Sequence, residues 1–277
     1  MKDFKIGLQL YSIREDMEKD MDSTLKKVKE IGYDYVEFAG YFGHSAEEVK
    51  AMLDKYGLEC VSVHQAPQLF AEEGQPAVDY IKTLGAKYCA IPWYEADRHK
   101  GTEYWPETVE LFTRVGKLLK ENGIQQLYHN HDFEFKKFED KYLLDWLYET
   151  IPADYLEPQI DTCWVNYAGC DPVEYIEKYA GRSKVIHLKD FTCKKKGNGP
   201  AYALIGEDGT EEKAASKEDN GFEFRPLGMG VQNIPAILEA ADKIDADILI
   251  VEQDQSNDRP PLEAAEISRK YLKSLGL

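Results

Sequence analysis

One unit recurs along this 277-residue chain: an amphipathic run, a glycine, two or three polar residues and a short apolar run. Glycine tolerates the left-handed conformation that commonly closes a helix, so each copy predicts a helix end, a turn and the next strand. These glycines are Gly32, Gly57, Gly85, Gly123 and Gly181, and the gap before the last is wide enough for two units. Helices and strands that alternate in this way predict a parallel sheet.

Two helix starts fit the same pattern. Ser45 and Glu48 form a capping-box motif ahead of apolar residues at helical spacing. Asp171 and Pro172 place a cap and a first-turn proline ahead of a second helix, which we expect Gly181 to end.

The apolar runs provide eight strands. Eight strand–helix units fit one closed (β/α)8 barrel better than an open sheet with a second domain, and α/β barrels of about 250 residues are routinely single domains. We therefore expect residues 1–277 to form a single TIM-barrel domain of the α/β class. The expected strands are 5–11, 34–38, 58–64, 87–92, 124–130, 157–161, 184–189 and 246–252.

One long segment, 191–227, interrupts the alternation after the seventh strand. It is rich in Lys, Gly, Glu and Asp, and it precedes a helix that begins near Asn233. A connection of this length is unusual unless it forms a lid, forms a partner surface or is disordered. The sequence leaves two alternatives open: an inserted lid above the catalytic face and a solvated surface loop.

Charge and cysteine content exclude several classes of function. The chain has 34 Lys and Arg residues against 51 Asp and Glu residues, a formal net charge of −17. This balance argues against nucleic acid or an anionic membrane as a partner, because polyanions are bound mainly by Lys and Arg. No apolar run approaches the roughly 20 residues that span a bilayer, no signal peptide is visible, and the five cysteines lack CxxC spacing. We expect a cytoplasmic protein, and a homo-oligomer stays open.

The last four expected strands all carry, at or near their ends, residue types that bind metals: His129, Asp161, His187 and Glu252. In a TIM barrel, the C-terminal strand ends form the face that carries the active site. Two imidazoles and two carboxylates suit Mn²⁺, Zn²⁺, Co²⁺ or Fe²⁺ better than Ca²⁺, which prefers oxygen ligands. Because buried charged groups need partners or a metal, we predict a metal site, with a metal-free polar pocket as the alternative.

Other side chains at or near the strand ends predict a pocket for a small sugar or polyol. Amides, carboxylates and imidazoles hydrogen-bond hydroxyl groups, and aromatic faces cover the C–H surface of a ring. His64 alone would fit a hydrogen-bonded core histidine equally well. The candidate substrate-binding residues are Gln9, Glu37, His64, Trp93, Trp164 and Arg225.

Several short motifs are spread along essentially the whole chain: 7–12 (GLQLYS), 128–131 (YHNH), 161–162 (DT), 171–172 (DP), 187–190 (HLKD), 226–230 (PLGMG) and 251–254 (VEQD). With these motifs the chain resembles the xylose isomerase-like TIM-barrel superfamily, in particular its sugar phosphate isomerase/epimerase group. The resemblance implies a divalent ion, Mn²⁺ first and Zn²⁺, Co²⁺, Fe²⁺ or Mg²⁺ as alternatives, at the ends of strands five to eight. Asp161, His187 and Glu252 match three of the four family ligands.

At two positions the chain departs from this family pattern. His129 stands where the family usually has a glutamate, which resembles the His-x-His arrangement of inosose dehydratase-like members, and Trp164 stands where a histidine is often found. In the family's epimerases, two metal-bound glutamates exchange a proton across the substrate. Only Glu252 of that pair is present here, so a histidine would have to be its counterpart.

The resemblance implies a reaction through an enediolate. Glu252 or His131 would remove a carbon-bound proton, and the other would return it or protonate a leaving hydroxyl. Lys189 would hold a substrate oxygen or, alternatively, pair with Asp190.

The first hypothesis is therefore an isomerase or epimerase acting on a sugar or keto-polyol. The second is a lyase of the inosose dehydratase or keto-glycoside type, and the third is a non-catalytic sugar-binding or partner subunit. The superfamily also contains DNA repair enzymes of the endonuclease IV type, which the acidic charge and the missing ligands argue against. No Gly-rich phosphate cradle stands out, and the acidic charge balance favours a neutral sugar.

Overall fold

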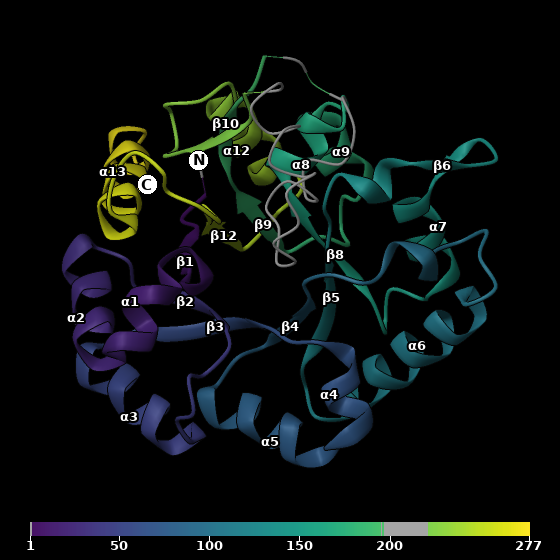
Figure 1. Ribbon diagram of the computed structural model, residues 1–277, viewed down its shortest axis with the longest axis horizontal. Coiled ribbons are helices and arrows are strands. Elements are labelled where there is room, and N and C mark those ends of the chain that lie inside the picture. Colours follow the sequence, from purple (N-terminus) through teal and green to yellow (C-terminus); the bar gives the residue numbers. More distant parts are fainter. Residues whose placement is uncertain (1, 195, 197–220) are drawn as a thin grey trace.

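The computed structural model describes residues 2–194, 196 and 221–277, and its centre is a closed barrel of eight parallel strands (Figure 1). Strand β1 pairs with both β2 and β12, and these pairings close the barrel. The single (β/α)8 TIM barrel is thus confirmed, with strand ends within two residues of those expected. The barrel strands are β1 (Lys5–Gln9), β2 (Tyr35–Ala39), β3 (Glu59–His64), β4 (Tyr88–Ile91), β5 (Gln125–His129), β8 (Glu157–Asp161), β9 (Val185–Leu188) and β12 (Ile248–Val251).

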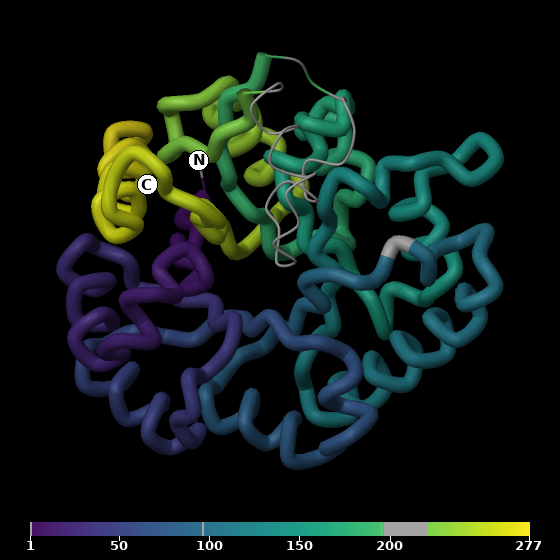
Figure 2. The backbone as a smooth tube through the Cα atoms, viewed as in Figure 1, coloured from purple at the N-terminus to yellow at the C-terminus, as the bar shows by residue number. Residues whose placement is uncertain are grey.

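Helices surround the barrel as an outer ring, which the path of the backbone in Figure 2 makes clear. None of the helices in the described ranges is long and apolar enough to cross a membrane. The α-helices are α1 (Arg14–Lys19), α2 (Met21–Ile31), α3 (Ala46–Tyr56), α4 (Pro67–Glu72), α5 (Gln75–Leu84), α6 (Trp105–Glu121), α7 (Leu143–Thr150), α8 (Thr162–Tyr167), α9 (Pro172–Lys178), α12 (Ile234–Lys243) and α13 (Pro261–Ser274). Short 3-10 helices lie at Leu10–Ile13, Ala96–Arg98 and Phe133–Phe135, and β6 (Lys137–Phe138) and β7 (Lys141–Tyr142) form a small hairpin.

The helix-end signals of the sequence are largely confirmed. Gly32 takes a φ of 104° at the end of α2, and the capping box of Ser45 and Glu48 is formed at the start of α3. Asp171 caps α9 as expected, but α9 ends at Lys178 rather than at Gly181. The glycine takes a positive φ in the turn that follows instead.

Alternation along the strands determines which side chains face the inside of the barrel. Residues two apart point to the same side of a strand. Val185 belongs to a small buried cluster that is separate from the main core. His187 comes two residues after Val185 on β9, so it points to the same side. Leu127 and His129 repeat the relationship on β5, as do Ile250 and Glu252 along β12 and just beyond it. The cluster Val61, Ala90, Leu127, Val185, Ile248 and Ile250 thus forms an apolar layer beneath the polar strand ends.

The described ends of the segment 191–227 pair with each other. Strands β10 (Asp190–Thr192) and β11 (Glu223–Arg225) form an antiparallel pair. Phe191, Phe222 and Phe224 pack with Trp164 and Tyr167 in one buried cluster. The prediction of a lid falls mainly on residues 195 and 197–220, which lie outside the described residues, and it stays a prediction.

Candidate metal centre and active site

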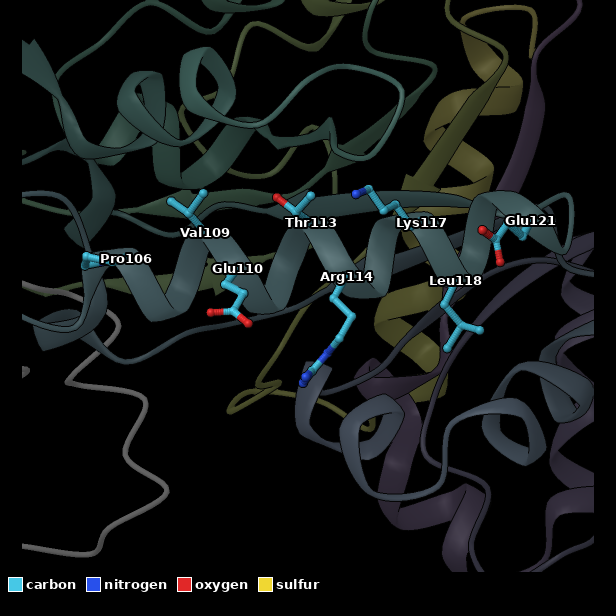
Figure 3. Close-up of a pocket in the computed structure, with 8 residues that line it drawn as sticks. All are labelled: Pro106, Val109, Glu110, Thr113, Arg114, Lys117, Leu118 and Glu121. Carbon is cyan, nitrogen blue, oxygen red and sulfur yellow. The ribbon is translucent and has the colours of Figure 1, made fainter.

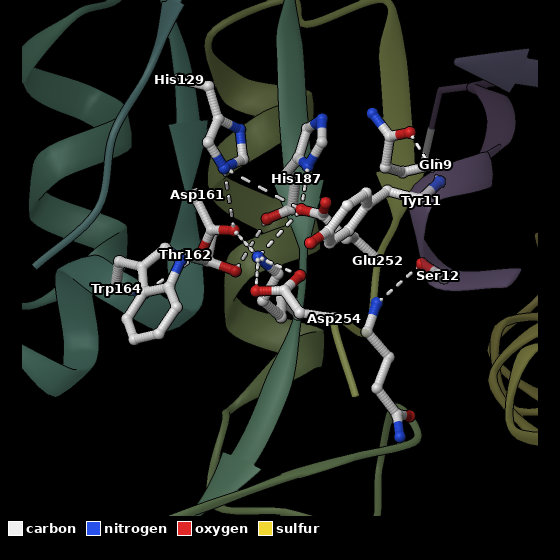
Figure 4. A network of polar contacts seen from close by, with 12 residues as sticks. Gln9, Tyr11, Ser12, His129, Asp161, Thr162, Trp164, His187, Glu252 and Asp254 are labelled. Atoms are coloured by element: carbon white, nitrogen blue, oxygen red, sulfur yellow. Dashed lines mark hydrogen bonds and ion pairs between the residues drawn. The ribbon is translucent and has the colours of Figure 1, made fainter. Parts of the chain in front are cut away.

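The four predicted metal ligands lie together at the C-terminal ends of adjacent strands (Figure 4). His129 and Asp161 are the last residues of β5 and β8, His187 lies in β9, and Glu252 directly follows β12. One ligand atom from each residue lies within 4.8 Å of the other three, and all four side chains are buried. The fold therefore brings the four residues to one point, as the sequence predicts.

The geometry of this cluster fits a divalent cation. His129 Nε2 lies 3.7 Å from Asp161 Oδ2 and 3.9 Å from Glu252 Oε2. His187 Nδ1 lies 2.9 Å from the same Glu252 oxygen. Asp161 Oδ2 is buried, and it lies 3.0 Å from Lys189 Nζ in an ion pair. Two imidazole nitrogens and two carboxylate oxygens that converge in this way form a donor set suited to Mn²⁺, Zn²⁺, Co²⁺ or Fe²⁺.

Glu37, on β2, is the hydrogen-bond acceptor at the centre of a network beside the ligands. Its Oε1 accepts from Gln9 Nε2 at 2.8 Å and from His187 Nε2 at 2.7 Å, and it lies 3.0 Å from His64 Nε2. Its Oε2 accepts from Gln159 Nε2 at 2.6 Å. Burial alone would favour the neutral acid, but His64 and His187 hold the pKa of Glu37 well below its usual range. Glu37 is therefore a carboxylate that orients His187.

The same network sets the protonation of His187. Burial disfavours the charged imidazolium, but the carboxylates of Glu37 and Glu252 outweigh it and raise the pKa of His187 to about 10. For Glu252, burial is likewise outweighed by Lys189 and His187, which hold its pKa well below the usual range. The ionised carboxylates of Glu37 and Glu252 therefore flank the His187 ring.

Lys189 places a buried ammonium group beside the candidate metal ligands. Its Nζ lies 2.9 Å from Glu252 Oε2, 3.0 Å from Asp161 Oδ2 and 3.0 Å from Asp254 Oδ1. Burial disfavours the ammonium, but Asp161, Asp254 and Glu252 raise the pKa of Lys189 well above its usual range. The alternative that Lys189 pairs with Asp190 is wrong, because Asp190 accepts instead from the backbone N–H groups of residues 228, 230 and 232.

His131 lies beside this cluster, next to His129. The centroids of the two rings are 5.2 Å apart, and the His131 ring stacks on Phe133 at 5.8 Å with an interplanar angle of 5°. Its backbone N–H donates to Glu134 Oε2 at 2.8 Å, which fixes the loop. Burial, with the charge of Lys189, holds the pKa of His131 well below its usual range. The cluster therefore has a neutral imidazole at its side.

Three of the predicted substrate-binding residues, Trp164, Trp93 and Arg225, differ in where they lie relative to the ligand cluster. Trp164 is fully buried, and its backbone N–H donates to Asp161 Oδ1 at 3.0 Å. Trp93 is 39% exposed in the loop after β4. Arg225 pairs with Glu223 and, at 3.4 Å, with Asp258. The contacts of the described residues bring neither Trp93 nor Arg225 into the ligand cluster, and their contact with substrate stays a prediction.

A family model described as Xylose isomerase-like TIM barrel matches residues 25–275 of this chain. The chain belongs to this family.

Relatives of this xylose isomerase-like protein include inosose dehydratases. The inosose dehydratase of Clostridium perfringens (strain 13 / Type A) is 24% identical over 277 residues, which cover 92% of this chain and 90% of the relative. That of Geobacillus kaustophilus is 24% identical over 192 residues, and the match covers 61% of this chain and 61%, less than two thirds, of the relative.

Solved structures of other proteins share the fold. A sugar phosphate isomerase/epimerase from Parabacteroides distasonis superposes with a TM-score of 0.74 and 24% identity, covering 99% of this chain and 95% of that chain. The IolI protein with a bound zinc atom gives a TM-score of 0.70 and 16% identity, covering 98% and 97%. At these identities the likeness shows the fold alone.

Two residues that contact the candidate site of this xylose isomerase-like barrel, Gln159 and Asp254, were missed in the sequence. Gln159 Oε1 lies 2.8 Å from His64 Nε2 and 3.1 Å from His129 Nδ1. Its position two residues before Asp161 on one strand is a signal that it faces the same side. Asp254 stands two residues after Glu252, but beyond the end of β12, where strand alternation no longer applies.

A pocket on the outside of the barrel is separate from this centre. It lies along α6 and is lined by side chains such as Val109, Thr113 and Lys117 (Figure 3). All of its lining residues belong to this one helix, so it contains none of the candidate ligands.

Proposed function

We propose that this protein is a metal-dependent lyase that dehydrates a keto-polyol or keto-sugar, acting in the cytoplasm on a neutral small molecule. The observation that carries the proposal is the composition of the site. A four-residue metal-binding cluster lies beside a neutral imidazole, His131, and an ammonium, Lys189, where the epimerase pattern has a second metal-binding glutamate. The curated inosose dehydratases that match the chain support the same reaction class. The free cysteines support a reducing compartment.

The proposed reaction begins with removal of a proton from the carbon next to the substrate carbonyl. A divalent ion held by His129, Asp161, His187 and Glu252 would polarise the substrate oxygen and stabilise the negative charge that develops on it. His131 takes the proton, since its neutral imidazole lies beside the ligand cluster, next to His129. Lys189 places a fixed positive charge beside the same oxygen.

The second step is loss of a hydroxyl group from the neighbouring carbon. The imidazolium of His131 returns its proton to the leaving hydroxyl, which departs as water, and the electron pair of the broken C–H bond forms the new double bond. One imidazole thus serves as base and then as acid. Glu252 is a weaker candidate for the base, because its carboxylate contacts both His187 and Lys189 and is one of the four proposed metal ligands.

A second candidate function is isomerisation or epimerisation of a sugar. Its support is the fold shared with the sugar phosphate isomerase/epimerase and with the L-ribulose 3-epimerase, the latter at a TM-score of 0.67 and 16% identity. The same residues would act, with the proton returned to carbon rather than to a leaving hydroxyl. The complete four-residue cluster argues against the third hypothesis, a non-catalytic sugar-binding subunit.

Proton exchange in deuterated water tests the proposal. The protein, loaded with Mn²⁺, is incubated with inososes and simple ketoses, and NMR and ultraviolet absorbance are followed. A dehydratase gives a new conjugated carbonyl absorbance with loss of the C–H signal, and the His131→Gln variant gives neither. Deuterium incorporation with an isomeric product and no new absorbance would instead support the isomerase. Absence of exchange on every substrate would contradict both functions.

A further inference from the structure

Lys189 shares its carboxylate partners with the candidate metal centre. Its side chain is 1% exposed. Its Nζ lies 3.0 Å from Asp161 Oδ2 and 2.9 Å from Glu252 Oε2. These two oxygens also face His129 Nε2, at 3.7 and 3.9 Å. A divalent ion in this cluster and the ammonium of Lys189 would therefore compete for the same two oxygens.

Asp254 offers Lys189 a partner that the ion does not need. Its carboxylate is 5% exposed and lies outside the four-residue cluster. Its Oδ1 and Oδ2 lie 3.0 and 3.3 Å from Lys189 Nζ. Lys189 Nζ also lies 5.4 Å from the centre of the Trp164 ring and 5.6 Å from that of Phe224. Aromatic faces on these sides attract a cation but accept no ordinary hydrogen bond, so Asp254 is the polar anchor.

We propose that Asp254 is a positioning residue, which holds the Lys189 ammonium beside the metal centre while a divalent ion takes the oxygens of Asp161 and Glu252. The inference rests on the proposed function, because it takes the four-residue cluster to be a metal site. With Asp254 present, the centre keeps two cations of different kinds, a divalent ion and an ammonium, facing the substrate. Without Asp254, the ammonium has only the oxygens that the ion requires, and it becomes a competitor.

The test is a double-mutant cycle on Mn²⁺ affinity, measured at one neutral pH on the full chain. Free Mn²⁺ is counted by its electron paramagnetic resonance signal in the wild type, Asp254→Asn, Lys189→Met and the double variant. We expect Asp254→Asn to weaken Mn²⁺ binding about tenfold, because Lys189 then occupies the ligand oxygens more firmly. In the Lys189→Met background, the same substitution changes the affinity by less than about twofold, because the competitor is absent.

Direct attraction between Asp254 and the ion predicts a different cycle. In that case Asp254→Asn weakens Mn²⁺ binding equally in both backgrounds, which would overturn the inference while leaving the metal site intact. An unchanged affinity in Asp254→Asn would also overturn it. Failure of the wild type to bind Mn²⁺ would overturn the inference together with the proposed function.

One further variant completes the design. Glu263→Gln removes one exposed carboxylate from the first turn of α13 and serves as a matched control that leaves Mn²⁺ affinity unchanged. Lys189→Met leaves three buried carboxylates without their cation and carries a risk of misfolding. The double variant removes one positive and one negative charge together, so it keeps the charge balance. If only the double variant of the two Lys189 variants folds, it is compared with Asp254→Asn: Mn²⁺ binding about tenfold tighter than in Asp254→Asn supports the inference, because the competitor is absent, and binding as weak as in Asp254→Asn contradicts it.

Discussion

Glu37 on β2 and His187 on β9 meet across the interior of the barrel, where Glu37 Oε1 accepts a hydrogen bond from His187 Nε2 at 2.7 Å. Because the carboxylate is ionised, the nitrogen that faces it must carry the proton. The other nitrogen, Nδ1, then lies toward Glu252, 2.9 Å from its Oε2. Glu37 thus determines which nitrogen of His187 faces the ligand cluster.

Replacement of this carboxylate by an amide tests its orienting role. We predict that Glu37→Gln weakens divalent-metal binding by about 10–100-fold, as is typical when the partner of a metal-binding histidine is lost. The affinity is measured by calorimetric titration with Mn²⁺. Glu59→Gln, at the exposed start of β3, is the control and should bind like the wild type. Equal affinities for both variants would show that Glu37 does not orient the site.

His131 is expected to act in the reaction without holding the metal. We predict that His131→Gln lowers kcat by about 10²–10⁴-fold, the usual contribution of a general base, while metal content stays at the wild-type level. Turnover is followed by ultraviolet absorbance, and metal content by elemental analysis of the same samples. Loss of metal from His131→Gln would make His131 a ligand rather than the base.

The buried acid Glu134 makes stability depend on pH. Burial raises the pKa of Glu134 to about 8 from an ordinary value of 4.5, although Tyr128 OH donates to it at 2.7 Å. The protonated acid is therefore favoured in the fold: its stabilisation is complete below pH 4.5 and is lost as pH rises toward about 8.

Glu134→Gln cannot ionise, and its amide can still accept from the His131 backbone N–H. We predict that its free energy of unfolding, relative to the wild type, rises by a few kcal/mol across this range of pH. Urea unfolding at a series of pH values measures the difference. A difference that stays constant with pH would show that Glu134 titrates normally.

The Asp190 carboxylate binds the backbone of residues 228–232, which follow the 191–227 segment, and holds them near the end of β9. Its Oδ2 accepts from the backbone N–H groups of Gly228 at 3.0 Å and Gly230 at 2.9 Å, and its Oδ1 accepts from that of Gln232 at 3.0 Å. A Cβ added at residue 230 would lie 2.1 Å from Asp190 Oδ1, so only glycine fits this close approach.

Asp190→Ala and Gly230→Ala disrupt the same contact. We predict that each lowers the free energy of unfolding by about 3 kcal/mol, since the backbone N–H groups of Gly228, Gly230 and Gln232 lose their acceptor, and that the double variant is no worse than the more severe single one. Val231→Ala, at a residue 47% exposed, changes stability by less than about 0.5 kcal/mol. Additive losses in the double variant would mean that the two residues act separately.

The strands and the four ligands could be predicted because both follow from local patterns. Apolar runs bounded by glycine turns mark the strands, and a polar residue at the end of such a run, like Asp161, lies at the catalytic face. The role of Glu37 was less accessible: its residue type and strand end suggested a substrate contact, whereas its hydrogen bond to His187 depends on how strands meet across the barrel.

Long side chains in loops were the hardest to place. The sequence gives the position of Arg225 near the expected face but not its partner, Asp258, which comes from another segment. Trp93 directly follows the expected strand 87–92, yet the loop after β4 leaves it partly exposed. Lys189 has an acidic neighbour in sequence, Asp190, but the backbone N–H groups of a distant segment engage that carboxylate instead.

Elemental analysis tests the central claim, that four strand-end residues hold one divalent ion. The wild type is stripped with a chelator, reloaded with Mn²⁺ and desalted, beside the variants His129→Ala, Asp161→Asn, His187→Ala and Glu252→Gln. We predict about one ion per chain in the wild type and strong loss in every variant, because each removes one of the four ligands. A wild type that retains no metal, or variants that all retain it, would contradict the account.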